Sequence, residues 1–166
     1  MKRILSFLLL VLIQNTAGFS QPDSLRQQIN QQVWKPFMKA FNDLDTEGFM
    51  AVHSREMSRV IQDGNLIYGH DKYNMEMKQG NENAKKTNQR RTLELRFTQR
   101  IAANDRAFEV GYYKFTSIER NGNIRKGFGK FHVLLRRENG TWKILMDADA
   151  SEKTDEHVFM SGKPME

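Results

Sequence analysis

Residues 91–150 read RTLELRFTQRIAANDRAFEVGYYKFTSIERNGNIRKGFGKFHVLLRRENGTWKILMDADA. Segments rich in β-branched and aromatic residues alternate here with pairs that favour tight turns. The turn pairs are Asn104-Asp105, Asn121-Gly122 and Asn139-Gly140. This order predicts four consecutive antiparallel strands over about 91–103, 106–120, 123–138 and 141–150.

These strands are too long to remain flat. A strand of about 14 residues would span roughly 45 Å if straight, which exceeds the usual strand length in a domain of this size. The sheet is therefore expected to curve, with bulges or bends at Gly111, Gly127 and Gly129. Alternation with polar residues along the first strand predicts a core-facing set of Leu93, Leu95, Phe97 and Ile101.

The same alternation predicts the two faces of the last strand. Trp142, Ile144 and Met146 are apolar and two residues apart, so they are expected on the concave face. Asp147 and Asp149 then fall on the opposite face. We interpret them as an outer-face salt bridge or dimer contact rather than as a catalytic pair.

The N-terminal part of the domain predicts helices. From Pro22 to Leu44, apolar residues recur at every fourth position, which indicates an amphipathic helix. Pro36 is expected to kink or break it, because proline lacks an N–H group and crowds the preceding turn. Asp45 or Thr46 can cap a short second helix that ends near Ser54.

A hairpin and a third helix lead from these helices to the long strands. Asp63-Gly64 lies between Arg59–Ile61 and Leu66–Tyr68 and predicts a tight hairpin turn. Asp71 can cap a third helix, which becomes polar beyond Gly80 and is expected to fray there. Helices first and long strands last predict an α+β fold, in which a curved antiparallel sheet of about six strands wraps around three N-terminal helices.

Composition fits one domain and excludes several classes of site. The 166 residues are 39% hydrophobic and 28% charged, and the absence of cysteine excludes disulfides, thiol nucleophiles and thiolate metal sites. No metal and no other cofactor is expected, because metal-ligand spacing is lacking among His53, His70, His132 and His157. No nucleic-acid partner is expected, because no aromatic residue interrupts the basic run of Lys85, Lys86, Arg90 and Arg91. We interpret that run as a solvated loop.

The first twenty residues have the features of a secretory signal peptide. Lys2 and Arg3 precede an apolar run over 4–13 that is too short to span a bilayer, and small residues follow it. Cleavage is expected after Ser20, with Gly18 as the alternative position. An uncleaved anchor or a buried N-terminal helix is the competing interpretation.

The expected organisation is a signal peptide at 1–20, one domain at 21–151 and a polar, mostly disordered tail at 152–166. Cleavage removes two positive charges and no acid, so the net charge falls from +6 to +4. A charge of that size mainly affects solubility and weak association. The mature protein is expected to be secreted or periplasmic, with no stable membrane anchor.

The order helix, helix, hairpin, helix and four long strands resembles the nuclear transport factor 2-like superfamily, which includes SnoaL-like and ketosteroid isomerase-like proteins. The resemblance covers about 28–151 and indicates a secreted bacterial type of unknown function. It rests on the helix Trp34–Leu44 leading into DTEGFMAVHS, on DGNLIYGHDKY, and on NGTWKILMDADAS. It implies a cone-shaped, cystatin-like sheet, a pocket in the mouth of the cone, and frequent dimerisation through the outer sheet face.

The catalytic groups of relatives are missing at the matching positions. Many relatives have two pocket histidines after the final tryptophan, where this chain has Met146 and Ala148 after Trp142. Isomerase-like relatives carry a catalytic carboxylate near the first hairpin strand, where this chain reads Arg59–Gln62. Asp63 is the nearest acid, and we interpret it as a turn residue. No catalytic role is therefore transferred to any residue.

The leading hypothesis is a non-catalytic module, a homodimer, that binds a small apolar ligand or partner in the cone. An isomerase, dehydratase or cyclase using a buried tyrosine or histidine on a small hydrophobic substrate is the alternative. A purely structural dimerisation module is the third. The candidate pocket-lining residues are Trp34, Phe37, Phe41, Tyr68, His70, Tyr73, Met77, Tyr113 and Met146.

Overall fold

The computed structural model describes residues 22–151 and 153–165. The predicted signal peptide and both cleavage positions lie outside the described residues. Within the described part, no helix is both long enough and apolar enough to cross a bilayer.

The N-terminal helical segment runs without a break through Pro36, so of the predicted kink or break only the break is wrong. It consists of α1 (Pro22–Ile29), a π-helical turn η1 (Asn30–Trp34) and α2 (Lys35–Asn42). The N–H group of Lys35 donates to the carbonyl of Asn30, five residues earlier. Because proline lacks an N–H group and crowds the preceding turn, a wider π turn there accommodates Pro36 inside a continuous helix.

The next helix begins where the sequence predicts. In α3 (Thr46–Ala51), the carboxylate of Asp45 accepts from the N–H group of Gly48 at 3.0 Å. The predicted capping of the following helix by Asp71 is wrong, because Asp71 lies inside that helix and Gly69 is at its N-cap position without a side-chain cap.

The predicted fraying of this following helix is also wrong, because α4 (His70–Lys86) continues well beyond Gly80. Asn81 explains the difference: its side chain is buried, donates to Thr46 Oγ1 at 2.8 Å and accepts from Arg91.

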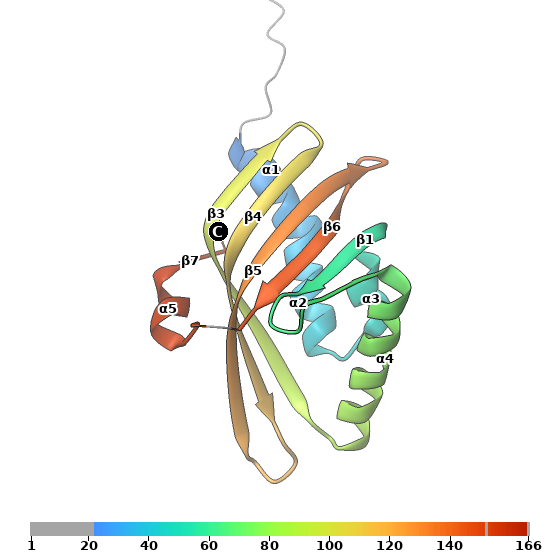
Figure 1. The fold of residues 1–166 in the computed structure, drawn as a ribbon, viewed down its shortest axis with the longest axis vertical. Helices are drawn as coiled ribbons and strands as arrows, with labels where there is room; N and C mark the ends of the chain where they lie inside the picture. Colours follow the sequence, from blue (N-terminus) through green and yellow to red (C-terminus); the bar gives the residue numbers. More distant parts are fainter. Residues whose placement is uncertain (1–21, 152, 166) are drawn as a thin grey trace, which may run out of the picture.

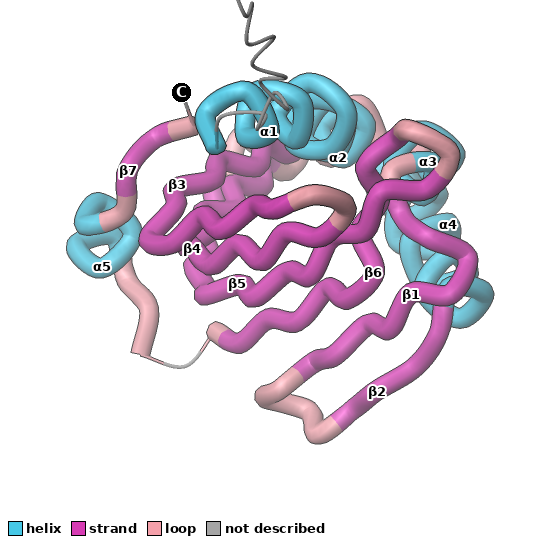
Figure 2. The backbone as a smooth tube through the Cα atoms, turned by 90° about the horizontal axis from the view of Figure 1, so that it is seen from above, coloured by secondary structure: helices cyan, strands magenta, loops and turns pink. Residues whose placement is uncertain are grey.

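The sheet has seven strands, one more than predicted. They are β1 (His53–Ile61), β2 (Leu66–Gly69), β3 (Arg90–Ala103), β4 (Arg106–Ile118), β5 (Ile124–Glu138), β6 (Thr141–Ala150) and β7 (Lys163–Pro164). Their order is β2-β1-β6-β5-β4-β3-β7, and among the described residues only β1 and β6 pair in parallel (Figure 1). The sheet curves, with α1, α2, α3 and α4 on one side of it, whereas α5 (Glu156–Ser161) lies apart from them beside β7 (Figure 2). The predicted α+β class and the four long strands are confirmed.

Two β-bulges overturn the predicted faces of β3 and β6. Thr98 is an extra residue on β3 opposite Gly111, and Leu145 is an extra residue on β6. An added residue moves all later side chains to the other face. Ile101, expected in the core, is therefore 52% exposed, whereas Arg100 turns inward to pair with the buried carboxylate of Glu109 at 2.8 Å.

The bulge in β6 has the larger consequence for function. Asp147 and Asp149, predicted to face outward, lie on the concave face with Val133 and Phe131 as their cross-strand neighbours. Met146, predicted to face the core, pairs with Leu134 on the outer face. The bulge thus places two carboxylates inside the cone.

The C-terminal segment is ordered, contrary to the predicted disorder of the tail. It forms α5 (Glu156–Ser161), and β7 pairs with Arg96 and Phe97 of β3. Phe159 is 2% exposed and lies with its ring centroid 6.1 Å from that of Phe128. One large buried apolar side chain and an added strand therefore hold this segment to the sheet.

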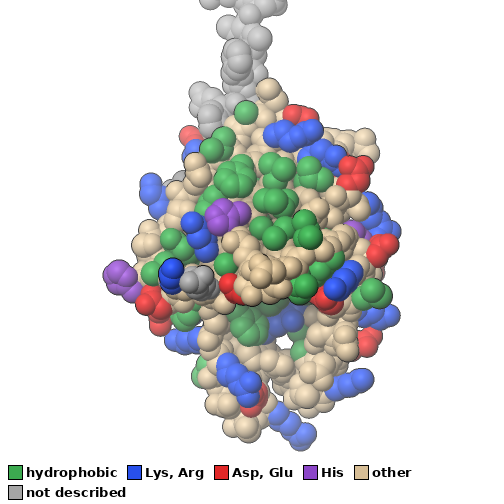
Figure 3. Space-filling view, in the orientation of Figure 1, with side chains coloured by type: hydrophobic (Ala, Val, Ile, Leu, Met, Phe, Trp, Pro, Cys, Tyr) green, Lys and Arg blue, Asp and Glu red, His purple; other side chains and the backbone are tan. Residues whose placement is uncertain are grey.

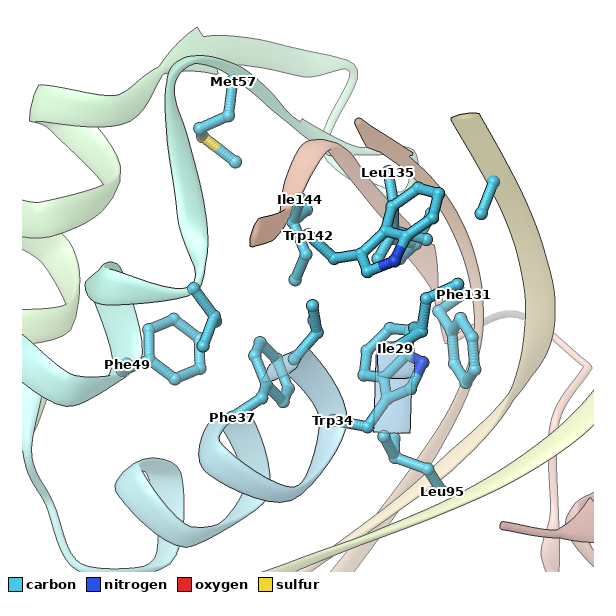
Figure 4. Close-up of a cluster of buried hydrophobic side chains, with 14 of the residues drawn as sticks. Ile29, Trp34, Phe37, Phe49, Met57, Leu95, Phe131, Leu135, Trp142 and Ile144 are labelled. Carbon is cyan, nitrogen blue, oxygen red and sulfur yellow. The ribbon is translucent and has the colours of Figure 1, made fainter. Parts of the chain in front are cut away.

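The core lies between the helices and the concave sheet face. Figure 4 shows Trp34 of the N-terminal helices next to Phe131 of the sheet, and Phe37 next to Phe49. The ring centroids of Trp34 and Phe131 are 5.6 Å apart, within the usual range for aromatic pairs. The core is thus built from the apolar stripe of the first helix and the concave face of β5 and β6.

Candidate functional site

A cavity of about 440 Å³ remains between the helices and the sheet. Figure 3 shows the molecule hollowed toward the end where β4 and β5 extend furthest. Helical residues provide one wall and β3, β4 and β5 provide another. The lining side chains are mostly aromatic or aliphatic: Trp34, Phe37, Phe41, Phe49, Leu93, Leu95, Phe115, Phe131 and Val133. Such a volume and lining suit a small organic molecule.

Four charged side chains interrupt this apolar lining, and three of them, Arg59, Asp147 and Asp149, lie together. Arg59 of β1 donates from Nη2 to Asp149 Oδ1 at 2.7 Å, and its Nη1 lies 3.6 Å from Asp147 Oδ1. The side chains of Arg59 and Asp147 are each only 11% exposed, and that of Asp149 is 22% exposed. One guanidinium therefore faces two carboxylates in a largely buried setting. We call Arg59, Asp147 and Asp149 together the acidic cluster.

Tyr73 and His53 complete the surroundings of Asp147. The hydroxyl of Tyr73 donates to Asp147 Oδ2 at 3.0 Å. The carbonyl of Phe49 lies 2.9 Å from His53 Nδ1, and since a carbonyl only accepts, this nitrogen carries the proton. His53 Nε2 then faces Asp147 Oδ2 at 3.9 Å. Asp147 thus accepts a hydrogen bond from Tyr73 and faces the Arg59 guanidinium and the His53 ring.

The two carboxylates differ in their electrostatic environment. Burial alone would raise the pKa of Asp147, but Arg59, His53 and Tyr73 together hold that pKa below its usual value. Burial raises the pKa of Asp149, and repulsion from Asp147 adds to this, while Arg59 only partly offsets it. Asp147 is the permanent anion of the pair, and Asp149 is the carboxyl that takes up a proton more readily.

Two tyrosine hydroxyls remain protonated beside this cluster. Burial raises the pKa of Tyr113 to about 12, with a further contribution from Asp149. Burial, followed by the charge of Asp147, raises the pKa of Tyr73 well above its usual value. Both therefore act as hydrogen-bond donors at neutral pH.

No protein-family model and no curated protein matches this chain. Solved structures do match. A nuclear transport factor 2-like protein of unknown function from Pseudomonas putida has a TM-score of 0.62 and 18% identity, covering 85% of this chain and 94% of its own. A nuclear transport factor 2-like protein with a cystatin-like fold from Novosphingobium aromaticivorans has a TM-score of 0.62 and 10% identity, covering 80% of this chain and 85% of its own. A ketosteroid isomerase-like protein from Erwinia carotovora has a TM-score of 0.58 and 16% identity, covering 77% and 96%.

The chain has the nuclear transport factor 2-like fold. The cavity lies within the curved sheet, as the resemblance implied. The shared fold does not transfer an activity, because function on such folds depends on the groups in the site.

Five of the nine predicted pocket residues line the cavity, and ligand binding by them stays a prediction. They are Trp34, Phe37, Phe41, Tyr73 and Tyr113. The other four do not line it. The hydroxyl of Tyr68 donates to Glu76, and His70 Nδ1 lies 3.1 Å from Arg55 Nη1. Met77 packs against the margin of the core, and Met146 lies on the outer sheet face.

Sequence reasoning missed the charged residues of the cavity. The sequence places Arg59 where isomerase-like relatives have an acid, and its alternation predicts the wrong face for the two aspartates. Arg91, assigned to a solvated loop, is a half-buried residue of the cavity wall. The turn assignment of Asp63 is confirmed, and its carboxylate accepts from the backbone N–H group of Ser151 at 2.7 Å.

Metal binding receives no support from the residues described. Among them, no group of three or more histidine, cysteine, aspartate or glutamate side chains is placed to hold a metal ion. The acidic cluster offers two carboxylates, and Arg59 already occupies the space between them.

Proposed function

We propose that this protein is an exported, homodimeric binding module whose cone cavity takes up a small, largely apolar molecule. The observation that carries the proposal is the cavity itself: about 440 Å³, lined mostly by aromatic and aliphatic side chains, with the acidic cluster at one side. Apolar walls supply binding free energy, and a few fixed polar groups orient the bound molecule. Export rests on the N-terminal sequence pattern.

The outer face of the sheet supports the proposed dimer. Apolar side chains gather there over β4, β5 and β6, on the side turned away from the helices (Figure 3). By strand register, Phe108 pairs with Leu134 and Leu134 with Met146, and all three remain partly exposed. A contiguous apolar patch of this kind is typical of an interaction surface.

An acid–base enzyme is the second candidate, and Asp149 is the observation that favours it. Its carboxyl lines the cavity and has a raised pKa, while the neighbouring Asp147 remains ionised. A carboxyl group of this kind is suited to proton transfer to or from a bound substrate. Recovery of a bound molecule in chemically changed form would favour this candidate over the binding module.

The cavity proposal predicts that Leu93→Trp abolishes binding of a neutral apolar dye. Leu93 lines the cavity, so an indole there fills space that a ligand needs. We expect the dissociation constant for 1-N-phenylnaphthylamine, measured by fluorescence titration, to rise at least tenfold. This corresponds to about 1.4 kcal/mol of lost binding free energy.

Thr92→Trp is the matched control, because Thr92 is exposed on the opposite face of the same strand. It adds the same indole outside the cavity and is expected to leave dye binding unchanged. Equal dye binding by the wild type and both variants would place the dye elsewhere and contradict the proposed function.

A further inference from the structure

Arg91 is a cation in the cavity wall that no carboxylate neutralises among residues 22–151 and 153–165. It belongs to β3, whereas the acidic cluster belongs to β1 and β6. Arg59, the other arginine of the cavity, pairs with both aspartates, but none of the ion pairs among the described residues includes Arg91. The cavity therefore has a compensated charge cluster at one side and an uncompensated guanidinium at another.

Neutral partners hold the guanidinium of Arg91 in place. Its Nε donates to the carbonyl of Phe41 at 2.7 Å, and its Nη2 donates to the side-chain oxygen of Asn81. The guanidinium carbon lies 3.8 Å from the centroid of the Phe41 ring. Within the described part of the chain, Nη1 donates to no acceptor. The group is thus positioned in advance and retains donor capacity and a full charge.

Burial of this guanidinium without a neighbouring carboxylate has an electrostatic cost. Burial lowers the pKa of Arg91 to about 10. A carboxylate beside it would reverse that effect, because a guanidinium and a carboxylate form charge-assisted, often paired hydrogen bonds. The neighbouring wall is apolar, with Phe41, Leu93 and Phe115 lining the same cavity.

The acidic cluster disfavours the opposite orientation of such a ligand. It holds two carboxylates against one guanidinium, so a third carboxylate there would meet net repulsion. Strands β4 and β5 separate β3 from β6, so the two polar regions lie on opposite sides of the cavity. One end of the cavity accepts an anion, and the other accepts a hydrogen-bond donor or an apolar end.

We propose that Arg91 binds the carboxylate of an amphipathic acid whose apolar part fills the cavity. This inference rests on the proposed function and adds the chemical class of the ligand. The ligand is a monocarboxylate with a chain or ring system of moderate length, oriented with its acid group toward β3.

Displacement of the neutral dye by decanoate and by 1-decanol at pH 7.5 tests this inference. In Arg91→Gln, the affinity for decanoate is expected to fall by about tenfold to a hundredfold, the range for loss of a hydrogen-bonded charge. The affinity for decanol is expected to change by less than about threefold. Arg90→Gln is the matched control, because Arg90 precedes it directly and is exposed. It makes the same change of charge and is expected to alter neither affinity.

Asn81→Asp provides a second variant that keeps Arg91 in place. A carboxylate beside Nη2 would neutralise the guanidinium of Arg91. The affinity for decanoate is therefore expected to fall about tenfold, while the affinity for decanol stays unchanged. An unchanged ratio of decanoate to decanol affinity in both variants would overturn the role of Arg91 while leaving the cavity proposal intact. Failure of the wild type to bind dye, decanoate and decanol would instead reject the cavity proposal, and this inference with it.

Discussion

Arg59→Met is expected to destabilise the folded protein by about 3–5 kcal/mol, the usual result of removing one partner from a buried ion pair. Without the guanidinium, Asp147 and Asp149 face each other in a largely buried cavity with no cation to offset them. Their desolvation and mutual repulsion then oppose folding. Urea unfolding followed by circular dichroism measures the free energy of unfolding, and its midpoint is expected to fall sharply.

The pH dependence of this effect identifies its cause. The lowered pKa of Asp147 contributes stability above its unfolded pKa, and this contribution disappears as the pH falls through the lower folded value. Protonated carboxyls are neutral and are no longer stabilised by the charge of Arg59. The difference in the free energy of unfolding between Arg59→Met and the wild type is therefore expected to shrink as the pH falls below about 4.

Arg55→Met is the matched control for Arg59→Met. Arg55 lies on the same strand with its side chain 81% exposed, and its substitution is expected to change stability by no more than about 0.5 kcal/mol. Equal stability of Arg59→Met and the wild type at neutral pH would show that the acidic cluster is not assembled as described.

Gly111→Ala is expected to destabilise the fold by about 3 kcal/mol, at the upper end for overpacking a close-packed site. A Cβ atom at this position would lie 2.1 Å from the carbonyl oxygen of Arg96 and 2.6 Å from the Phe131 ring. Gly111 lies opposite the bulge at Thr98, so neither the backbone nor the ring can easily move away. The free energy of unfolding in urea is again the measurement.

Gly127→Ala is the comparison that separates crowding from a general effect of replacing glycine in a strand. The only atom near a Cβ at Gly127 is a Phe115 ring carbon at 3.8 Å, an ordinary contact. We expect this variant to be at least as stable as the wild type, because alanine also restricts the unfolded chain. Similar losses in both variants would contradict the assigned role of Gly111.

The local patterns of the sequence were sufficient to predict the architecture. The turn pairs predicted the ends of the long strands, and Asp45 caps its helix as predicted. The apolar residues at every fourth position after Pro22 form a buried helical stripe. The C-terminal segment was the exception. Its single anchoring ring, Phe159, gives no periodic pattern, and only packing against Phe128 and pairing with β3 orders it.

The candidate site was only partly predictable, and the reason is the bulges. Alternation assigns faces correctly only while the register is continuous, and one extra residue reverses every assignment beyond it. The extra residue Leu145 reverses the sheet face of Asp147 and Asp149. The extra residue Thr98 reverses the sheet face of Arg100 and Ile101. Aromatic residues of the helices, such as Phe37 and Phe41, were predictable because both lie in the regular helix α2.

Native mass spectrometry of the protein purified from its own host tests the central claim most directly. We predict a dimer of chains that begin at Gln21 or Phe19, each carrying a noncovalent molecule on the order of a few hundred daltons, the size that such a cavity admits. Denaturation should release that molecule, and Leu93→Trp should lack it. The contradicting result would be the mass of the polypeptide alone, unchanged after decanoate and decanol are added. That result would exclude a ligand-binding cone.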